Sequence, residues 1–340
     1  MDSYKKILVI NVNWLGDAVF SMPVFRTLKE YSPEASISCL GPSRIRPVME
    51  ATPEVDEFIA FDEKAAHKSA WAKWQLITQL RKKKFDAAVI LHRSLTRALL
   101  AFLAGIPIRV GYNTKNRGML LTNHVSLPSK ELHRADHYLH VLQGIGINGS
   151  KSPSTLNVSK SDQEVIEKIL IDHRVNLMEQ LIVIHSGGNW DLKQWPVHYF
   201  QQLVQGLVQK EGIKIILTGS QKDQPRVKDI IGECSAQVVN LTGELDIKQF
   251  IALLKRADLL ISSDSGPLHL ANNVGTNVIG LFGPTRPEIT GPIGQGKAII
   301  LQHDVQCNQK PCYNLNCPNN ICMQSISVEE VFNAIDQIKD

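Results

Sequence analysis

One segment in the second half of the sequence combines hydroxyl, carboxylate, glycine and imidazole groups in an order typical of phosphate binding. It reads SSDSGPLHLA, from Ser262 to Ala271, and follows the apolar run DLLIS. Pro267 favours the first turn of a helix, and the free backbone N–H groups at a helix start attract anions. The alternative for His269 is a histidine packed in the core, which is the more common role of a lone histidine at such a position. The candidate contacts to a diphosphate are Asp264, Ser265, Gly266 and His269.

A second small-residue loop follows the apolar run LIVIH. It reads HSGGNW from His185 to Trp190 and continues as DLKQWP to Pro196. Small residues leave backbone N–H groups accessible and a lysine adds a point charge, so the loop suits a phosphate. An ordinary strand–helix loop with a surface lysine would explain the same residues. The candidate phosphate contacts are Ser186, Gly187 and Lys193.

An acidic residue stands at the first strand exit of the chain. The segment NWLGDA, from Asn13 to Ala18, follows the apolar run KILVIN and contains Gly16 and Asp17. Asp17 could cap the next helix, or it could act as a general base. The loop has one glycine, so it lacks the GxGxxG pattern of a dinucleotide site.

Two further strand exits carry small and acidic residues. The run TGSQKD, from Thr218 to Asp223, could line a ribose pocket, since a carboxylate accepts hydrogen bonds from sugar hydroxyls. Helix capping would explain Asp223 equally well. The run GLFGPT, from Gly280 to Thr285, is another glycine-rich exit. The candidate nucleoside contacts are Gly219, Asp223 and Glu244.

The elements that position these residues alternate between buried strands and amphipathic helices, which predicts parallel sheets covered on both faces. The expected strands are 6–11, 37–40, 57–61, 85–91 and 108–111 in the first half, and 181–185, 214–218, 237–241, 258–262 and 277–282 in the second. The expected helices are 17–31, 64–82, 94–104 and 133–145, and then 161–173, 196–210, 222–233, 246–256 and 266–274.

The sequence predicts two α/β domains joined by one linker. The segment INGSKSPSTLNVSK, residues 147–160, is rich in Ser, Asn, Pro and Gly. We expect an N-terminal domain over 1–155, a nucleotide-binding domain over 156–326, and a last helix within 327–340 that packs back on the first domain. Ligands of doubly wound sheets bind beyond the carboxyl ends of the strands, so we expect a cleft between the two domains.

Composition and charge exclude several classes. The chain has 340 residues, 43% hydrophobic and 21% charged, as in ordinary soluble proteins. No apolar run approaches the roughly 20 residues of a membrane span, and the N-terminal run is too short for a signal peptide. Without export, the six cysteines should be reduced. Residues 1–160 carry 22 Lys and Arg against 13 Asp and Glu, so a polyanionic partner or a solvated basic face is expected.

Four long motifs together resemble the ADP-heptose:lipopolysaccharide heptosyltransferases of Gram-negative bacteria. They are WLGDAVFSMPVFRTLK, HSGGNWDLKQWP, TGSQKD, and LTGELD with the later RADLLISSDSGPLHLANNVGTNVIGLFGPT. The resemblance spans nearly the whole chain. It implies a GT-B fold of two Rossmann-like domains, and inverting, metal-independent transfer of a heptose from ADP-heptose to Kdo-lipid A or a heptosylated inner core. It also implies a cytoplasmic enzyme, either free in the cytoplasm or in peripheral contact with the inner membrane.

The resemblance assigns roles to the residues already singled out. Asp17 matches the proposed base for the acceptor hydroxyl, and Lys193 matches a lysine that contacts the donor phosphates. Asp264, Ser265, Gly266 and His269 match the D-x-G-x-x-H segment at the diphosphate and sugar. No cofactor is implied, because ADP-heptose is a substrate.

The basic first half fits an anionic acceptor. Guanidinium groups suit carboxylate and phosphate recognition. Trp71 and Trp74, near Lys68 and Lys73, could touch a membrane interface or be packed. No nucleic-acid partner is expected. The candidate acceptor contacts are Arg93, Arg97, Arg109 and Arg117.

Other functions remain open at this point. The same fold could use another nucleotide sugar and polysaccharide acceptor, or serve a sugar-nucleotide epimerase or a non-catalytic carbohydrate-binding module. The spacing of Cys307, Cys312, Cys317 and Cys322 lacks the close CxxC pairs of structural zinc sites, so a reduced structural loop is favoured over a metal.

Overall fold

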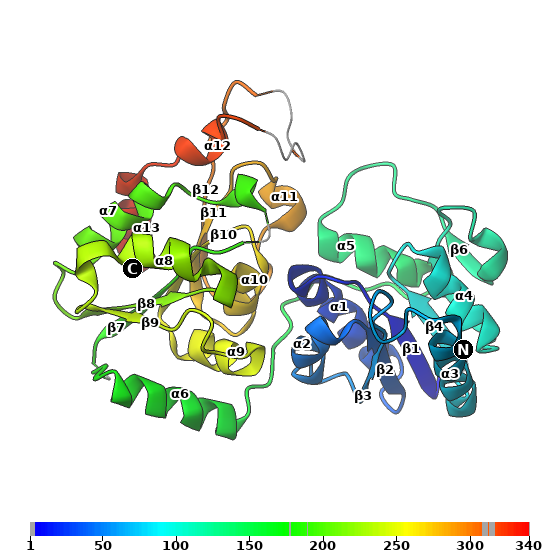
Figure 1. Ribbon diagram of the computed structural model, residues 1–340. Helices are drawn as coiled ribbons and strands as arrows, with labels where there is room; N and C mark the ends of the chain where they lie inside the picture. Colours follow the sequence, from blue (N-terminus) through cyan, green and yellow to red (C-terminus); the bar gives the residue numbers. More distant parts are fainter. Residues whose placement is uncertain (1–3, 177, 189, 308–311, 313–316, 340) are drawn as a thin grey trace. The chain divides into compact units, whose positions relative to one another are not determined.

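The chain divides into two compact units, Met1–Asn157 and Val158–Asp340 (Figure 1). The division falls two residues beyond the expected boundary. The computed structural model describes residues 4–176, 178–188, 190–307, 312 and 317–339. The segment from Cys307 to Cys322, for which a reduced loop is predicted, lies largely outside these residues. Each unit is described by itself.

The first unit is built on a sheet of six parallel strands in the order β3-β2-β1-β4-β5-β6. Its two central strands read KILVI and AAVI and are buried except at Lys6, because both faces of the sheet are covered by helices. The strands are β1 Lys6–Ile10, β2 Ser36–Gly41, β3 Glu57–Ala60, β4 Ala87–Ile90, β5 Ile108–Tyr112 and β6 Asn123–Val125.

The helices of the first unit connect these strands. Ser69 caps α3 with its hydroxyl, and the Nδ1 atom of His133 caps α5. One core contains Leu76 and Leu80 of α3, packed with Ala98 and Ala101 of α4. The helices are α1 Leu15–Tyr31, α2 Arg46–Glu50, α3 Ala70–Lys83, α4 Leu95–Leu103 and α5 Arg134–Leu139, with 3-10 turns η1 Ser43–Ile45, η2 Gly118–Leu120 and η3 His140–Ile145.

The second unit repeats this architecture with a parallel sheet in the order β12-β11-β10-β7-β8-β9. Read from β9 to β12, and with β7 counted as the first strand, this sheet has the same strand order, 3-2-1-4-5-6, as the sheet of the first unit. The strands are β7 Gln180–His185, β8 Ile213–Thr218, β9 Val238–Asn240, β10 Leu259–Ser263, β11 Asn277–Leu281 and β12 Ala298–Leu301.

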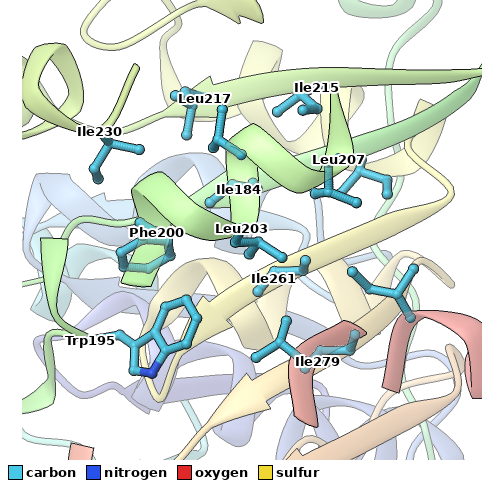
Figure 2. Packing of buried hydrophobic residues seen from close by; sticks show 14 of the residues in the cluster. Ile184, Trp195, Phe200, Leu203, Leu207, Ile215, Leu217, Ile230, Ile261 and Ile279 are labelled. Carbon is cyan, nitrogen blue, oxygen red and sulfur yellow. The ribbon is translucent and has the colours of Figure 1, made fainter. Parts of the chain in front are cut away.

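The core of the second unit lies between its sheet and helix α7. Figure 2 shows Trp195 and Phe200 close to Leu203, with isoleucines of the sheet around them. The rings of Trp195 and Phe200 meet edge to face at 4.9 Å. The helices are α6 Lys160–Asp172, α7 Val197–Leu207, α8 Gln224–Ile231, α9 Ile247–Arg256, α10 Gly266–Asn273, α11 Pro287–Thr290, α12 Ile321–Gln324 and α13 Val328–Lys339, with η4 Asp191–Lys193, η5 Gln221–Asp223 and η6 Gly232–Cys234.

The last helix corrects one expectation. We expected residues 327–340 to pack back on the first domain, but α13 packs against α7, β11 and β12 of the second unit. Val331 and Ile335 are fully buried in that core. The apolar face of the helix is therefore used within its own unit.

The expected doubly wound organisation is confirmed in both units. In each sheet, successive strands are added first on one side of the first strand and then on the other. This switch point lies between the parallel neighbours β1 and β4 in the first unit and β7 and β10 in the second. The loops that leave such a pair diverge, and the crevice between them is where ligands bind in this fold.

The sequence expectations missed the short edge strands β6 and β12 and the helix α2. β6 has three residues, too few for a periodic pattern. The expected helix 64–82 begins at Ala70 instead, because Ser69 caps it there. No helix among the described residues is long and apolar enough to cross a membrane.

Candidate active site

The switch point of the second unit brings together two of the predicted phosphate loops. His185 at the end of β7 pairs in register with Ser262 near the end of β10, so the loops after these strands leave side by side. The Nζ atom of Lys193 donates to Oδ2 of Asp264 at 2.8 Å and to the Asp264 backbone carbonyl at 3.1 Å. The structure thus joins two segments that the sequence separates by 71 residues.

The carboxylate of Asp264 is the centre of a buried polar cluster. Its Oδ1 lies 3.3 Å from Nε2 of His269, and its Oδ2 accepts a hydrogen bond from the Thr290 hydroxyl at 3.2 Å. Burial alone would raise the pKa of Asp264, but the contacts with His269 and Lys193 outweigh it and hold the pKa well below its usual range. Asp264 is therefore ionised at neutral pH and fixes the lysine beside it.

Packing of a neighbouring tryptophan holds the lysine loop. Trp195 is fully buried, and its Nε1 atom donates to the Ile326 carbonyl at 2.9 Å. Lys193 ends the short turn η4, with its ammonium 5.3 Å from the ring centre of Trp190. Trp195, the tryptophan of the WP pair, therefore fixes the loop in the core, and this loop positions the Lys193 ammonium.

The start of α10 lies beside this ion pair. Ser265 is the N-cap residue, and no side chain caps the helix. Pro267 has no N–H and the Leu268 N–H donates to the Ser265 carbonyl, so the N–H of Gly266 is the one left to a ligand in this first turn. The hydroxyls of Ser186 and Ser263 are buried and have no hydrogen-bond partner among the described residues. Ser263 was not among the sequence candidates. The Gly266 N–H, the Lys193 ammonium and two hydroxyls without a described partner suit an anionic ligand.

The predicted nucleoside residues occupy the next loops of the same sheet edge. Oδ2 of Asp223 accepts hydrogen bonds from the backbone N–H and the hydroxyl of Ser220, which forms a capping box. Any side chain at Gly187 would collide with that carboxylate, 2.7 Å from the position of a Cβ atom. The capping interpretation of Asp223 thus has direct support, and its nucleoside role, with those of Gly219 and the exposed Glu244, stays a prediction.

Asp17 lies at the switch point of the first unit, in the first turn of α1. Trp14, not Asp17, is the N-cap residue of this helix, and its side chain makes no capping hydrogen bond. The capping alternative for Asp17 is therefore wrong. A carboxylate in the first helical turn is still favoured by the helix dipole. Its side chain is 29% exposed, so it is accessible to a ligand.

Two side chains of α5 hold the Asp17 carboxylate. The Tyr138 hydroxyl donates to Oδ1 of Asp17 at 2.7 Å, and Nε of Arg134 lies 3.7 Å from the same oxygen. Burial, followed by the charge of Asp17, raises the pKa of Tyr138 well above its usual value, so the phenol keeps its proton. Neither α5 residue was a sequence candidate. The only signal was a short polar run, HRADHY, inside an expected helix.

Arg93 extends the cationic side of this first site. It follows β4, is exposed, and its Nη2 atom lies 2.7 Å from Nε2 of His137. Its guanidinium also lies 5.8 Å from the ring centre of Tyr112. Burial and the nearby Arg93 lower the pKa of His137 to about 4, so this imidazole is neutral at pH 7. A neutral imidazole accepts the hydrogen bond from Nη2, which leaves the other guanidinium donors of Arg93 to an anion.

The structure corrects three of the four predicted acceptor arginines. Arg97 is 2% exposed and Arg117 is fully buried. Arg97 donates to the Asn11 carbonyl at 2.7 Å and Arg117 to the Tyr112 carbonyl at 2.8 Å, so both brace the strand exits from inside. Arg109 stands near the beginning of β5 and bonds the Leu120 and Ile106 carbonyls, at the opposite edge of the sheet.

Among the residues that the structure describes, no group of three or more His, Cys, Asp or Glu side chains is arranged to hold a metal ion. Cys322 lies against Gly283 at the exit of β11, and Cys307 is exposed. The cysteines that the structure describes are not in disulfide bonds.

Two doubly wound units in one chain, each with polar loops at its switch point, are the organisation of the GT-B fold. A glycosyl transferase family 9 protein from Veillonella parvula superposes with a TM-score of 0.90 at 25% identity, covering 99% of this chain and 98% of that one. The ADP-heptose lipopolysaccharide heptosyltransferase II of Escherichia coli superposes with a TM-score of 0.80 at 25% identity, covering 98% of each.

The sequence comparisons identify the family within this class. The model of glycosyltransferase family 9 (heptosyltransferase) matches residues 73–320. Lipopolysaccharide heptosyltransferase 2 of Escherichia coli is 29% identical over 306 residues, which cover 87% of each chain. The chain belongs to glycosyltransferase family 9, as the motif resemblance implied, and it is a glycosyltransferase.

Proposed function

We propose that this enzyme transfers a heptose from ADP-heptose to the inner core of lipopolysaccharide, either Kdo-lipid A or an already heptosylated core. The observation that carries the proposal is the Lys193–Asp264 pair at the start of α10, within the part matched by the heptosyltransferase model. The names of the similar heptosyltransferases of Escherichia coli support the choice of donor and acceptor.

The donor half of the mechanism rests on the second unit. Lys193, the Gly266 N–H and the positive end of the α10 dipole stabilise the negative charge that develops on the departing diphosphate. Asp264 holds Lys193 in place, and His269 and Thr290 hold Asp264. The spare hydroxyls of Ser186 and Ser263 offer further hydrogen bonds to donor oxygens.

The acceptor half rests on the first unit. Asp17 takes the proton of the acceptor hydroxyl as its oxygen attacks the anomeric carbon, and the bond from that carbon to the diphosphate oxygen breaks. A single displacement of this kind inverts the anomeric configuration. Tyr138 and Arg134 hold the carboxylate for this step, and Arg93 offers a guanidinium to the anionic acceptor.

We also propose that transfer needs no metal ion. The charge of Lys193 and the dipole of α10 supply fixed positive potential where the diphosphate departs. We place the enzyme in the cytoplasm. Because the proposed acceptor is anchored in a membrane, we also propose peripheral contact of the enzyme with the inner membrane.

A donor panel tests the proposal. Purified enzyme is given Kdo-lipid A or, in parallel, heptosylated Kdo-lipid A as the acceptor, with ADP-heptose, ADP-glucose, UDP-glucose or GDP-mannose as the donor. Product is measured in buffer with and without EDTA. We expect product from ADP-heptose alone, unchanged by EDTA, and tighter calorimetric binding of ADP than of UDP or GDP. Transfer from a UDP or GDP sugar instead would overturn the heptose assignment in favour of another polysaccharide acceptor system. Donor isomerisation without acceptor would favour an epimerase.

A further inference from the structure

Exposed apolar side chains gather on the outer faces of two helices of the first unit. On α3, Trp71 is 68% and Trp74 48% exposed. On α4, Leu95, Leu99 and Phe102 are 47%, 39% and 44% exposed. Their spacing of four and three residues places all three on one side of α4. Single exposed apolar residues are ordinary, but two aligned sets mark an interaction surface.

The two helices are neighbours in the fold. They pack against each other, and Arg81 of α3 donates to the Leu103 carbonyl at the end of α4 at 2.6 Å (Figure 1). Their inner residues, among them Leu80 and Ala101, fill one core. The outer apolar residues are therefore not needed for that core.

The surroundings of these residues are strongly basic. Residues 64–130 contain thirteen lysines and arginines and a single acidic residue, Asp86. A surface groove along α3 runs from the two tryptophans to Lys82 and Lys83, and Lys84 beyond it is exposed. We define the α3–α4 face as Trp71, Trp74, Leu95, Leu99 and Phe102 together with Arg81, Lys82 and Lys84.

The α3–α4 face reaches the edge of the sheet that holds the acceptor-side residues. Both helices follow parallel strands, so both begin at the carboxyl edge. Leu95 comes two residues after Arg93, and Asp17 lies in the first turn after β1 at the same edge. An acceptor anchored in a surface under this face would present its sugars next to the proposed base.

We propose that the α3–α4 face docks on an anionic phospholipid bilayer. Tryptophan rings favour the headgroup region, leucine and phenylalanine side chains insert just below it, and the cationic residues attract anionic headgroups. The excess of positive charge selects this occupant over an apolar protein partner. The inference rests on the proposed function for its purpose, since it supplies the surface that meets a lipid-anchored acceptor.

Vesicle flotation tests the docking without any transferase reaction. The full chain is mixed with phosphatidylcholine vesicles that contain either no or about one third phosphatidylglycerol. We expect binding to the anionic vesicles that weakens as salt rises. The double variant Trp71→Gln, Leu99→Gln should lose about tenfold or more in partition coefficient. The pair Lys82→Gln, Lys84→Asn should lose a similar factor at low salt.

Matched controls come from the second unit. Ile171 is 68% and Met178 89% exposed, so Ile171→Gln, Met178→Gln removes comparable exposed apolar surface and should leave flotation unchanged. The pair Lys214→Gln, Lys228→Gln controls for charge. Equal flotation of the tryptophan variant and wild type, with unchanged melting temperatures, would overturn the proposal, as would equal binding to neutral and anionic vesicles.

Activity separates this inference from the proposed function. With a deacylated, water-soluble acceptor, the α3–α4 variants should match wild type, and with acceptor embedded in anionic vesicles they should lose about tenfold in rate. Loss of activity on the soluble acceptor would assign the face to the acceptor site and contradict docking. Wild type that floats but transfers no heptose would refute the proposed function and leave the docking intact.

Discussion

The ammonium of Lys193 and the carboxylate of Asp264 form a contact of 2.8 Å across the switch point of the second sheet. The carboxylate is 4% exposed and the lysine 22%, so the pair presents its positive member to solvent. Asp264, a buried acid that retains its charge, thus holds the Lys193 ammonium beyond the carboxyl ends of β7 and β10.

Substitution of this lysine should weaken donor use more than it weakens the fold. Lys193→Gln removes the charge at the departing diphosphate, so we expect kcat/KM to fall about 10²–10³-fold and ADP affinity to fall about tenfold. Asp264 retains His269 and Thr290, so the loss of stability should stay near the value of one hydrogen bond to a charged group, about 1.5–3 kcal/mol. Lys228→Gln, an exposed lysine of the same unit, is the control. Unchanged kcat/KM in Lys193→Gln would remove the lysine from the mechanism.

Asp17→Asn should abolish turnover while ADP binding stays intact. The amide oxygen can still accept from Tyr138, so the local structure should persist, but the group no longer takes a proton. We expect kcat to fall about 10²–10⁴-fold, measured by product formation and by calorimetry with ADP. Tyr138→Phe should lower kcat by about three- to tenfold with the donor KM unchanged. Near-normal turnover of Asp17→Asn is the outcome that contradicts the base assignment.

Arg93 and Arg109 differ in their predicted effect on the acceptor. Arg93 is exposed at the carboxyl edge, whereas Arg109 bonds carbonyls at the opposite edge. Arg93→Gln should raise the acceptor KM about tenfold or more, the value of a charge-assisted hydrogen bond, and Arg109→Gln should leave it unchanged. Steady-state kinetics at saturating donor decide the point. Equal effects of both variants would speak against a specific acceptor contact.

Arg117 should matter for stability. Its side chain is fully buried and donates to the carbonyls of Tyr112 and His92, so Arg117→Met leaves buried acceptors unpaired. We expect a loss of about 2–4 kcal/mol in the free energy of unfolding, measured in urea. The exposed change Lys82→Met should stay within about 0.5 kcal/mol. A stable Arg117→Met variant would show that these carbonyls find other partners.

His185 should make the second unit sensitive to acid. Burial lowers its pKa to about 4, against about 6.5 in the unfolded chain. Between these values the unfolded state binds a proton that the folded state does not, so stability falls as the pH drops from 6.5 toward 4. His185→Gln can still bond the Thr218 hydroxyl and should lose about 1–2 kcal/mol less than wild type between pH 7 and 4.5, measured by urea unfolding. If the free energy of unfolding depended on pH equally in His185→Gln and wild type, His185 would not be the source of the acid sensitivity.

The sequence predicted the loops of the site better than the surroundings of each side chain. Asp264 and Lys193 follow apolar strands, and parallel topology alone brings strand exits to one edge. Burial of an arginine leaves no such pattern: Arg97 and Arg93 stand four residues apart, yet one braces backbone carbonyls and the other is exposed. Tyr138 reaches Asp17 from 121 residues away, through the packing of α5 on α1, which local sequence does not encode.

The division of the chain after Asn157 separates the proposed acceptor and donor groups along the sequence, which affects how the enzyme can evolve. Every proposed acceptor-side group, Asp17, Arg93, Arg134 and Tyr138, precedes the junction after Asn157, and every proposed donor group follows it. Each substrate preference is therefore carried by one uninterrupted stretch of coding sequence, within a unit that has its own core. Recombination at this junction would exchange one preference as a block and leave the other unchanged.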